Sequence, residues 1–121
     1  MLYFFYGTLK SKETRQAIRL DHLMKSRCEY TLKDYAMWSY HGNFPTVVPK
    51  EGSEVKGELF EVSKYDVKKV NDLLDYYENC PDLYKRVEID DGENTFSTYV
   101  WNRSLDDCTL IEGGIWNTEV E

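Results

Sequence analysis

Leu73-Leu74-Asp75-Tyr76-Tyr77-Glu78-Asn79-Cys80-Pro81-Asp82-Leu83-Tyr84-Lys85-Arg86 is the stretch on which the prediction of fold and function depends. It joins the end of a predicted helix to a turn that contains proline and then to a strand. Ser63 and Asp66 have the spacing of a capping box at the start of that helix. Apolar residues recur at three- and four-residue spacing, which predicts one apolar helix face: Val67, Val70, Leu74 and Tyr77.

Glu78 lies four residues after Leu74, so it projects from the apolar face if the helix extends that far. Burial there would disfavour the ionised carboxylate, and the helix dipole and the like charge of Asp75 would act in the same direction. A pKa raised by about one or two from its reference near 4.3 would suit a general acid or base. The alternative is that Glu78 lies past the helix end in water, because glutamate is rarely buried without a partner.

The composition indicates one folded domain over residues 1–121. The hydrophobic share is 41% and the aromatic share 15%, which is too high for a disordered chain. The 15 basic and 22 acidic residues give a net charge of -7, which argues against nucleic-acid binding through a basic surface. No apolar run approaches the roughly 20 residues of a membrane-spanning helix.

The three cysteines, Cys28, Cys80 and Cys108, have no paired Cys-x-x-Cys spacing. They indicate reduced thiols in a cytoplasmic protein better than a disulfide framework or a zinc site. The start of the chain, residues 1–7, has no basic segment and is expected to be a strand, not a signal peptide. His22 and His41 have no neighbour at metal-ligand spacing, so no metal is expected.

Strands outnumber helices in the predicted order of elements. Strands are expected at 2–6, 27–32, 36–40, 55–62, 84–89 and 95–101, with an extended segment at 44–49. Strands 27–32 and 36–40 are expected to pair around Lys33-Asp34, and Asp90-Asp91-Gly92 is expected to form a hairpin turn. Helices are expected at 12–24 and after Ser63, and a polar tail from Asn102. The pattern predicts an α+β fold: a small, mostly antiparallel β-barrel of about six or seven strands flanked by two main helices.

Tyr6-Gly7-Thr8-Leu9, called loop 6–9 below, is a second candidate site. A strand that ends in glycine can bring successive backbone N–H groups close to a carboxylate or an oxyanion. The alternative is an ordinary turn after a strand. Arg86 has two interpretations as well, since it could pair with a substrate carboxylate or with Asp75 or Glu78. Cys80 is interpreted as structural, because it has no basic neighbour.

Several motifs follow one another along the chain. They are Phe-Tyr-Gly-Thr-Leu-Lys at 5–10, Phe-Pro-Thr-Val-Val at 44–48, Val-Lys-Gly-Glu-Leu-Phe-Glu-Val at 55–62, Leu-Asp-x-x-Glu at 74–78, Tyr-Lys-Arg at 84–86 and Tyr-Val-Trp at 99–101. In this order and spacing, the chain resembles the γ-glutamylcyclotransferase family, including its AIG2-like members. The segment 78–86 is most similar to the γ-glutamylamine cyclotransferase branch.

The resemblance implies a small barrel in which backbone groups of Tyr6, Gly7, Thr8 and Leu9 hold a γ-glutamyl group. It implies that Glu78 is the catalytic acid and base, in a lyase-type cyclisation that yields 5-oxoproline and a free amine without cofactor or metal. The expected partner is a small γ-glutamyl amine or peptide, with no nucleic acid and no membrane. The alternatives are a non-catalytic member that binds a small metabolite or a protein, and a hydrolase of γ-glutamyl bonds.

Overall fold

Two long strands form most of the sheet in the computed structural model, which describes residues 1–116. The six strands of this part of the chain are ordered β4-β5-β1-β3-β2-β6, and every neighbouring pair is antiparallel except β1 with β5. Their bounds are β1 Leu2–Phe5, β2 Met24–Tyr40, β3 Phe44–Val62, β4 Tyr84–Asp90, β5 Thr95–Trp101 and β6 Cys108–Ile111. The helices are α1 Lys12–Ala17 and α2 Val67–Tyr77, with short 3-10 turns at Thr8–Lys10 and Asp21–Leu23. The predicted α+β class is thus confirmed, and the predicted small, mostly antiparallel barrel of six or seven strands is a six-stranded sheet curled into a half-barrel.

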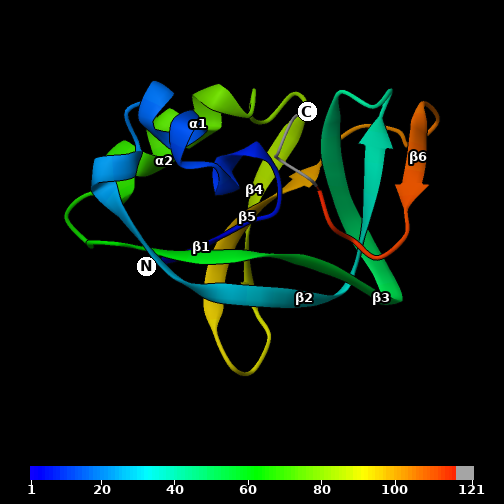
Figure 1. Cartoon of the computed structure of the whole chain (residues 1–121), viewed down its shortest axis with the longest axis horizontal. Coiled ribbons are helices and arrows are strands. Elements are labelled where there is room, and N and C mark those ends of the chain that lie inside the picture. Colours follow the sequence, from blue (N-terminus) through cyan, green and yellow to red (C-terminus); the bar gives the residue numbers. More distant parts are fainter. Residues whose placement is uncertain (117–121) are drawn as a thin grey trace.

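A bend in the β2–β3 hairpin accounts for the curl of the sheet. Lys33 lies opposite Glu54, whereas Tyr35 lies opposite Pro49, so residues 50–53 of β3 are looped out against a single residue of β2. Asp34 has a φ of 67° and its carboxylate accepts a hydrogen bond of 3.0 Å from the N–H of Gly52. Beyond this point both strands turn away from the rest of the sheet, and β2 pairs with β6 (Figure 1).

This bend corrects the prediction that strands 27–32 and 36–40 pair with each other. Both belong to β2, and Lys33-Asp34 is a bulge in that strand instead of a hairpin turn. The expected segments 44–49 and 55–62 likewise belong to one strand, β3. Lys33-Asp34 does interrupt the regular strand. The hydrogen bond between the Asp34 side chain and Gly52, 18 positions away, stabilises a bulge there instead of a hairpin turn.

The first helix is shorter than the expected 12–24. Ser11 caps α1 through a hydrogen bond from the N–H of Thr14 to its side chain, and the helix ends at Ala17. Arg19 follows with a φ of 63°, which a continuing helix does not allow. Leu20, just after the helix, is buried, whereas Ala17 is exposed.

The second helix is confirmed, but its predicted capping box does not form. Asp66 is the N-cap residue and makes no side-chain cap, while the Ser63 hydroxyl accepts a hydrogen bond from the N–H of Tyr65. Val70 and Leu74 are fully buried in a cluster that also contains residues of β1. In Figure 1, α1 and α2 lie together on one side of β1 and the long part of β2 and β3.

The segment after Asn102 contains a strand that the sequence pattern did not reveal. Cys108–Ile111 forms β6 and pairs with Met37–Tyr40 of β2. The chain then returns to β3, where the carbonyl of Gly114 accepts a hydrogen bond of 2.8 Å from the N–H of Lys56. The expected polar tail therefore includes a short edge strand, and its last residues, 117–121, lie outside the described residues.

Gly57→Ala is expected to destabilise the protein by about 1–3 kcal/mol, the usual cost of overpacking a well-packed core. A Cβ atom at Gly57 would lie 2.3 Å from the carbonyl oxygen of Phe5 and 2.7 Å from the ring of Phe4. Urea unfolding measures the change, with Glu61→Ala, at an exposed position of the same strand, as control. An unfolding midpoint equal to that of the wild type would contradict this packing.

Candidate active site

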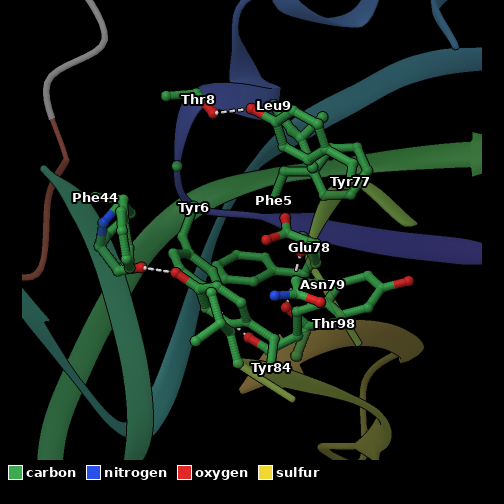
Figure 2. A pocket seen from close by; sticks show the side chains of 15 residues that line it. Phe5, Tyr6, Thr8, Leu9, Phe44, Tyr77, Glu78, Asn79, Tyr84 and Thr98 are labelled. Atoms are coloured by element: carbon green, nitrogen blue, oxygen red, sulfur yellow. Dashed lines mark hydrogen bonds between the residues drawn. The ribbon is translucent and has the colours of Figure 1, made fainter. Parts of the chain in front are cut away.

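A cavity of about 320 Å³ lies between loop 6–9, the end of α2 and strands of the curled sheet. Its size is at the small end of the range for small-molecule sites. Figure 2 shows Glu78 within this group of residues, with Thr8 and Leu9 on one side and Tyr84 on the other. The lining residues are Phe4, Phe5, Tyr6, Gly7, Thr8, Leu9, Phe44, Pro45, Tyr77, Glu78, Asn79, Leu83, Tyr84, Thr98 and Tyr99. The structure therefore brings both sequence-predicted candidates to one cavity.

A helix-ending motif positions Glu78. The N–H of Glu78 still donates to the carbonyl of Leu74, as in a helix. Asn79 follows with a φ of 53°, its N–H donates to Tyr76, and the N–H of Cys80 donates to Asp75. This pair of reversed hydrogen bonds is the Schellman motif. It stops the helix directly after Glu78, so the side chain points into the cavity while the chain turns away.

The environment of the Glu78 carboxylate is apolar. Within residues 1–116, no side-chain hydrogen bond and no ion pair reaches it, and it faces the aromatic lining of the cavity. Burial raises the pKa of Glu78 from 4.5 to about 7. A carboxyl group with such a pKa is present in both protonation states near neutral pH, which suits it to accept and return a proton.

Asp75 does not act on Glu78 as a like charge, contrary to the sequence-based interpretation. Its carboxylate accepts hydrogen bonds of 3.2 and 3.3 Å from two nitrogens of Arg86. It also accepts a short hydrogen bond from the Tyr99 hydroxyl. Because its charge is compensated, burial alone is the cause of the raised pKa of Glu78. Of the two interpretations of Arg86, the internal pair is the one observed.

Loop 6–9 leaves the sheet as an extended strand and enters a 3-10 turn. The N–H groups of Lys10 and Ser11 donate to the carbonyls of Gly7 and Thr8, which closes this turn. In the part of the chain that the structure describes, the N–H groups of Gly7, Thr8 and Leu9 donate no hydrogen bond. These three groups are the unsatisfied donors at the start of a helical turn, and an anionic oxygen can accept from them.

Gly7 is required by space in this loop. A Cβ atom there would lie 2.9 Å from the ring of Pro45, which lines the same cavity. Tyr6 is fixed to β5, because its hydroxyl donates a hydrogen bond of 2.6 Å to the carbonyl of Tyr99. At the rim, the hydroxyls of Thr8 and Tyr77 form a hydrogen bond of 2.9 Å that joins the loop to the end of α2 (Figure 2).

Arg15 supports the loop and was missed by the sequence analysis. Its Nη1 donates hydrogen bonds of 2.9 and 2.7 Å to the carbonyls of Leu9 and Lys10, and its Nε bonds to Asp21 at 3.0 Å. The guanidinium also lies 4.6 Å from the centre of the Phe60 ring. The only sequence signal is an arginine in a short polar helix, which ordinarily indicates an exposed position.

Arg15→Met is expected to loosen loop 6–9, because two charge-assisted hydrogen bonds are lost. If this loop binds the γ-glutamyl group, as the sequence resemblance implies, KM for a γ-glutamyl amide should rise by about tenfold with a smaller effect on kcat, which steady-state kinetics measure. Arg27→Met, which removes a pair with Glu61 on the protein surface, is the matched control. An unchanged KM in Arg15→Met would contradict the assigned support of the loop.

The remaining sequence candidates lie away from the cavity lining. His22 and His41 are exposed, and Cys80 is partly buried against the hydrophobic core. Among residues 1–116, no three side chains of the metal-binding types come together. Over the same residues, the search for a helix that is both long and apolar enough to cross a membrane finds none.

Comparison with known proteins identifies the class of protein to which this chain belongs. Its fold is a six-stranded curled sheet with two helices, and an acidic residue lines its cavity. The family model for γ-glutamyl cyclotransferase, AIG2-like proteins matches residues 3–118. The chain belongs to this family, and the resemblance seen in the sequence is thereby confirmed.

Individual relatives agree with this assignment. A γ-glutamylcyclotransferase family protein, ytfP, of Citrobacter rodentium is 28% identical over 96% of this chain and 95% of its own length. The γ-glutamylaminecyclotransferase of Bos taurus is 31% identical over 71% of this chain, which spans about half (53%) of that relative. The solution structure of ytfP from Escherichia coli has a TM-score of 0.71 with 25% identity and 96% coverage of both chains. A mouse AIG2-like protein has the same fold, with a TM-score of 0.67 and 22% identity over 98% of this chain and 89% of its own.

Proposed function

We propose that this protein is a γ-glutamylamine cyclotransferase, which converts a γ-glutamyl amide to 5-oxoproline and a free amine. The observation that carries the proposal is the position of Glu78, a carboxyl group with a pKa of about 7, in one cavity with the free N–H groups of loop 6–9. The family and the names of the relatives support this type of activity. The geometry of the cavity supports the catalytic and binding roles proposed here.

The reaction uses a nucleophile that the substrate itself carries. In the cavity the γ-glutamyl chain curls so that its α-amino group reaches the γ-carbonyl carbon. A new C–N bond closes a five-membered ring, and the C–N bond to the leaving amine breaks. Because this step is intramolecular, correct positioning alone lowers the barrier by several kcal/mol.

Glu78 relays a proton from the attacking nitrogen to the leaving nitrogen. Its ionised form takes a proton from the substrate ammonium group, which frees the nucleophile. This proton then passes from the Glu78 carboxyl group to the departing amine. The α-nitrogen gives up a second proton as it becomes the lactam N–H, the released amine takes up that proton to become an ammonium ion, and Glu78 is left in its ionised form. The N–H groups of Gly7, Thr8 and Leu9 hold the oxygens of the γ-glutamyl group, including the oxygen that becomes negative as the ring closes. Water is not consumed.

The identity of the product tests the proposal. Purified protein incubated with γ-glutamyl-ε-lysine is expected to release 5-oxoproline and lysine, which mass spectrometry identifies. Free glutamate in place of 5-oxoproline would instead show hydrolysis. If a panel of γ-glutamyl amines and dipeptides gave neither product, the proposal would be overturned in favour of a binding function, and titration with 5-oxoproline would then map the site.

The pH profile is expected to follow the ionisation of Glu78. Because the base form is needed first, kcat/KM should rise about tenfold per pH unit below pH 7 and level off above it. Stopped assays between pH 5 and 9, a range that brackets the pKa of Glu78, measure kcat/KM. A profile that is already flat from pH 5 would show that no group with this pKa controls the reaction.

A further inference from the structure

Three residues form the rim of the cavity, where its lining meets solvent. Of the 15 described lining residues, these are the ones that are exposed: Thr8, Tyr77 and Asn79. Tyr77 has the largest side chain of the three and directly precedes Glu78 at the end of α2. Its hydroxyl forms the 2.9 Å hydrogen bond with the hydroxyl of Thr8, drawn as a dashed line in Figure 2. The mechanism proposed above does not use this phenol ring.

The neighbouring tyrosine shows that the orientation of Tyr77 is specific. Tyr76 is 90% exposed and lies outside the cavity lining, whereas Tyr77 is 39% exposed and lines the cavity. Successive residues of a helix project about 100° apart, so the two rings leave α2 in different directions. In the view of Figure 2, Tyr77 and its hydrogen bond to Thr8 lie over Glu78. Tyr77 therefore turns most of its surface toward the cavity, beside the carboxyl group of Glu78.

Phenol groups on the buried side of the cavity also face Glu78. Tyr6 directly follows β1, Tyr84 belongs to β4 and Tyr99 to β5. Burial raises the pKa of each of these phenols, and the negative charge of Glu78 acts in the same direction. The three phenols are therefore neutral near pH 7, and none supplies a charge that would hold Glu78 in its ionised form.

The charged side chains around Glu78 are engaged with other partners. Asp75, one turn earlier in α2, pairs with Arg86 of β4. The ammonium group of Lys10, next to loop 6–9, donates to the carbonyl of Trp116. All other described residues of the lining are uncharged. Exclusion of water, and not a charged partner, therefore determines how readily Glu78 ionises, and the rim is the side from which water can enter.

We propose that Tyr77 is a positioning residue: its ring covers the carboxyl group of Glu78, and the hydrogen bond to Thr8 holds the ring in place. The inference rests on the proposed function and adds a residue that controls the proton-transfer group. A hydrogen bond between two exposed hydroxyls competes with water and opens without uncovering a charge. Its opening admits the substrate, and its closure excludes water from Glu78 during proton transfer.

Tyr77→Ala tests the cover over Glu78. Without the ring, water reaches the carboxyl group, so the midpoint of the acid limb of kcat/KM should fall by about one pH unit or more. Above the midpoint, kcat/KM should fall by about fivefold or more, because a weaker base accepts the proton less readily. Titration of the Glu78 carboxyl carbon by ¹³C NMR, without substrate, should show the same downward shift of the midpoint.

Tyr76→Ala is the matched control, because it removes the same ring from the adjacent, exposed position of α2. It should leave the NMR midpoint, the pH profile and kcat/KM unchanged. Circular dichroism establishes that both variants are folded. Tyr77→Gln is the second variant for the same measurements, since glutamine favours helix and admits water to Glu78.

Tyr77→Phe and Thr8→Val test the hydrogen bond that holds the ring. Each variant removes one hydroxyl and keeps the approximate size of the side chain, so each should lower kcat/KM by about threefold while shifting the midpoint less than Tyr77→Ala does. The double variant should equal the single variants, because the second hydroxyl has already lost its partner. Fully additive losses would overturn the role of the hydroxyl pair.

The NMR midpoint and the product assay separate failure of the inference from failure of the proposed function. An NMR midpoint in Tyr77→Ala equal to that of the wild type would overturn the inference, whether or not 5-oxoproline is released. An equal shift in Tyr76→Ala, or a wild-type midpoint already near 4.5, would overturn it as well. A lowered midpoint in Tyr77→Ala alone would support the cover, and absence of 5-oxoproline from the wild type would then overturn only the function.

Discussion

Glu78→Gln is expected to reduce kcat for 5-oxoproline formation by about 10²–10⁴-fold, the usual contribution of a positioned general acid–base. Glutamine keeps the size of the side chain but cannot take the proton from the substrate ammonium group or return it to the leaving amine. Since the effect is on proton transfer and not on binding, KM should change far less than kcat. Product release followed by mass spectrometry over a range of substrate concentrations measures both constants.

Glu93→Gln is the control for this variant, because Glu93 is exposed near the β4–β5 turn and outside the cavity lining. It should retain wild-type turnover. If Glu78→Gln also turned over substrate at the wild-type rate, Glu78 could not be the acid–base group, and the proposed mechanism would have to be abandoned.

Glu78→Gln is also expected to be more stable than the wild type above neutral pH. In the unfolded chain Glu78 ionises near its usual pKa of 4.5, whereas in the folded protein it does so near 7. Between these values the folded state holds a proton that the unfolded state has lost, so the contribution of Glu78 to stability falls as pH rises. It is fully present below pH 4.5 and is lost once pH passes 7.

Glutamine carries no charge and escapes this loss. The difference in unfolding free energy between Glu78→Gln and the wild type should therefore grow from about zero near pH 4 to roughly 3 kcal/mol at pH 8, from the pKa difference and about 1.4 kcal/mol per unit. Urea unfolding at a series of pH values measures this. A difference that stays constant across the series would show that Glu78 has the same pKa in the folded and unfolded states.

These two expectations belong together. A group that is retained although it destabilises the protein at neutral pH is characteristic of a functional site, where a perturbed pKa serves the chemistry. The Schellman motif at Asn79 and Cys80 places the carboxyl group in this position, and the apolar lining of the cavity raises its pKa. Loop 6–9 supplies the facing donors, and Arg15 holds the loop in place.

The sequence could predict features that depend on neighbouring residues. Asp90-Asp91-Gly92 predicted the turn between β4 and β5, and apolar spacing predicted α2, with Glu78 directly after it. The family resemblance supplied the connection between Glu78 and loop 6–9, which are about 70 residues apart and share no local signal. The cavity now contains both, while their assigned roles remain predictions.

The features that the sequence could not predict depend on contacts between distant segments. The hydrogen bond between Asp34 and Gly52 stabilises the bend of β2. Strand β6 forms because Cys108–Ile111 pairs with the edge of β2 that β3 leaves open. Arg15 is buried because carbonyls of the loop accept its hydrogen bonds. A polar sequence of six helical residues indicates a solvated helix, and only the folded chain reveals these acceptors.

The central claim is that the cavity gives Glu78 the pKa of a general acid–base. Its most direct test is a titration of the Glu78 side-chain carboxyl carbon by ¹³C NMR, with the signal assigned by its loss in Glu78→Gln. A buried carboxyl group should titrate with a midpoint of about 7. A midpoint near the ordinary value of 4.5 would show a solvated carboxylate and would contradict the assignment of Glu78 as the general acid–base.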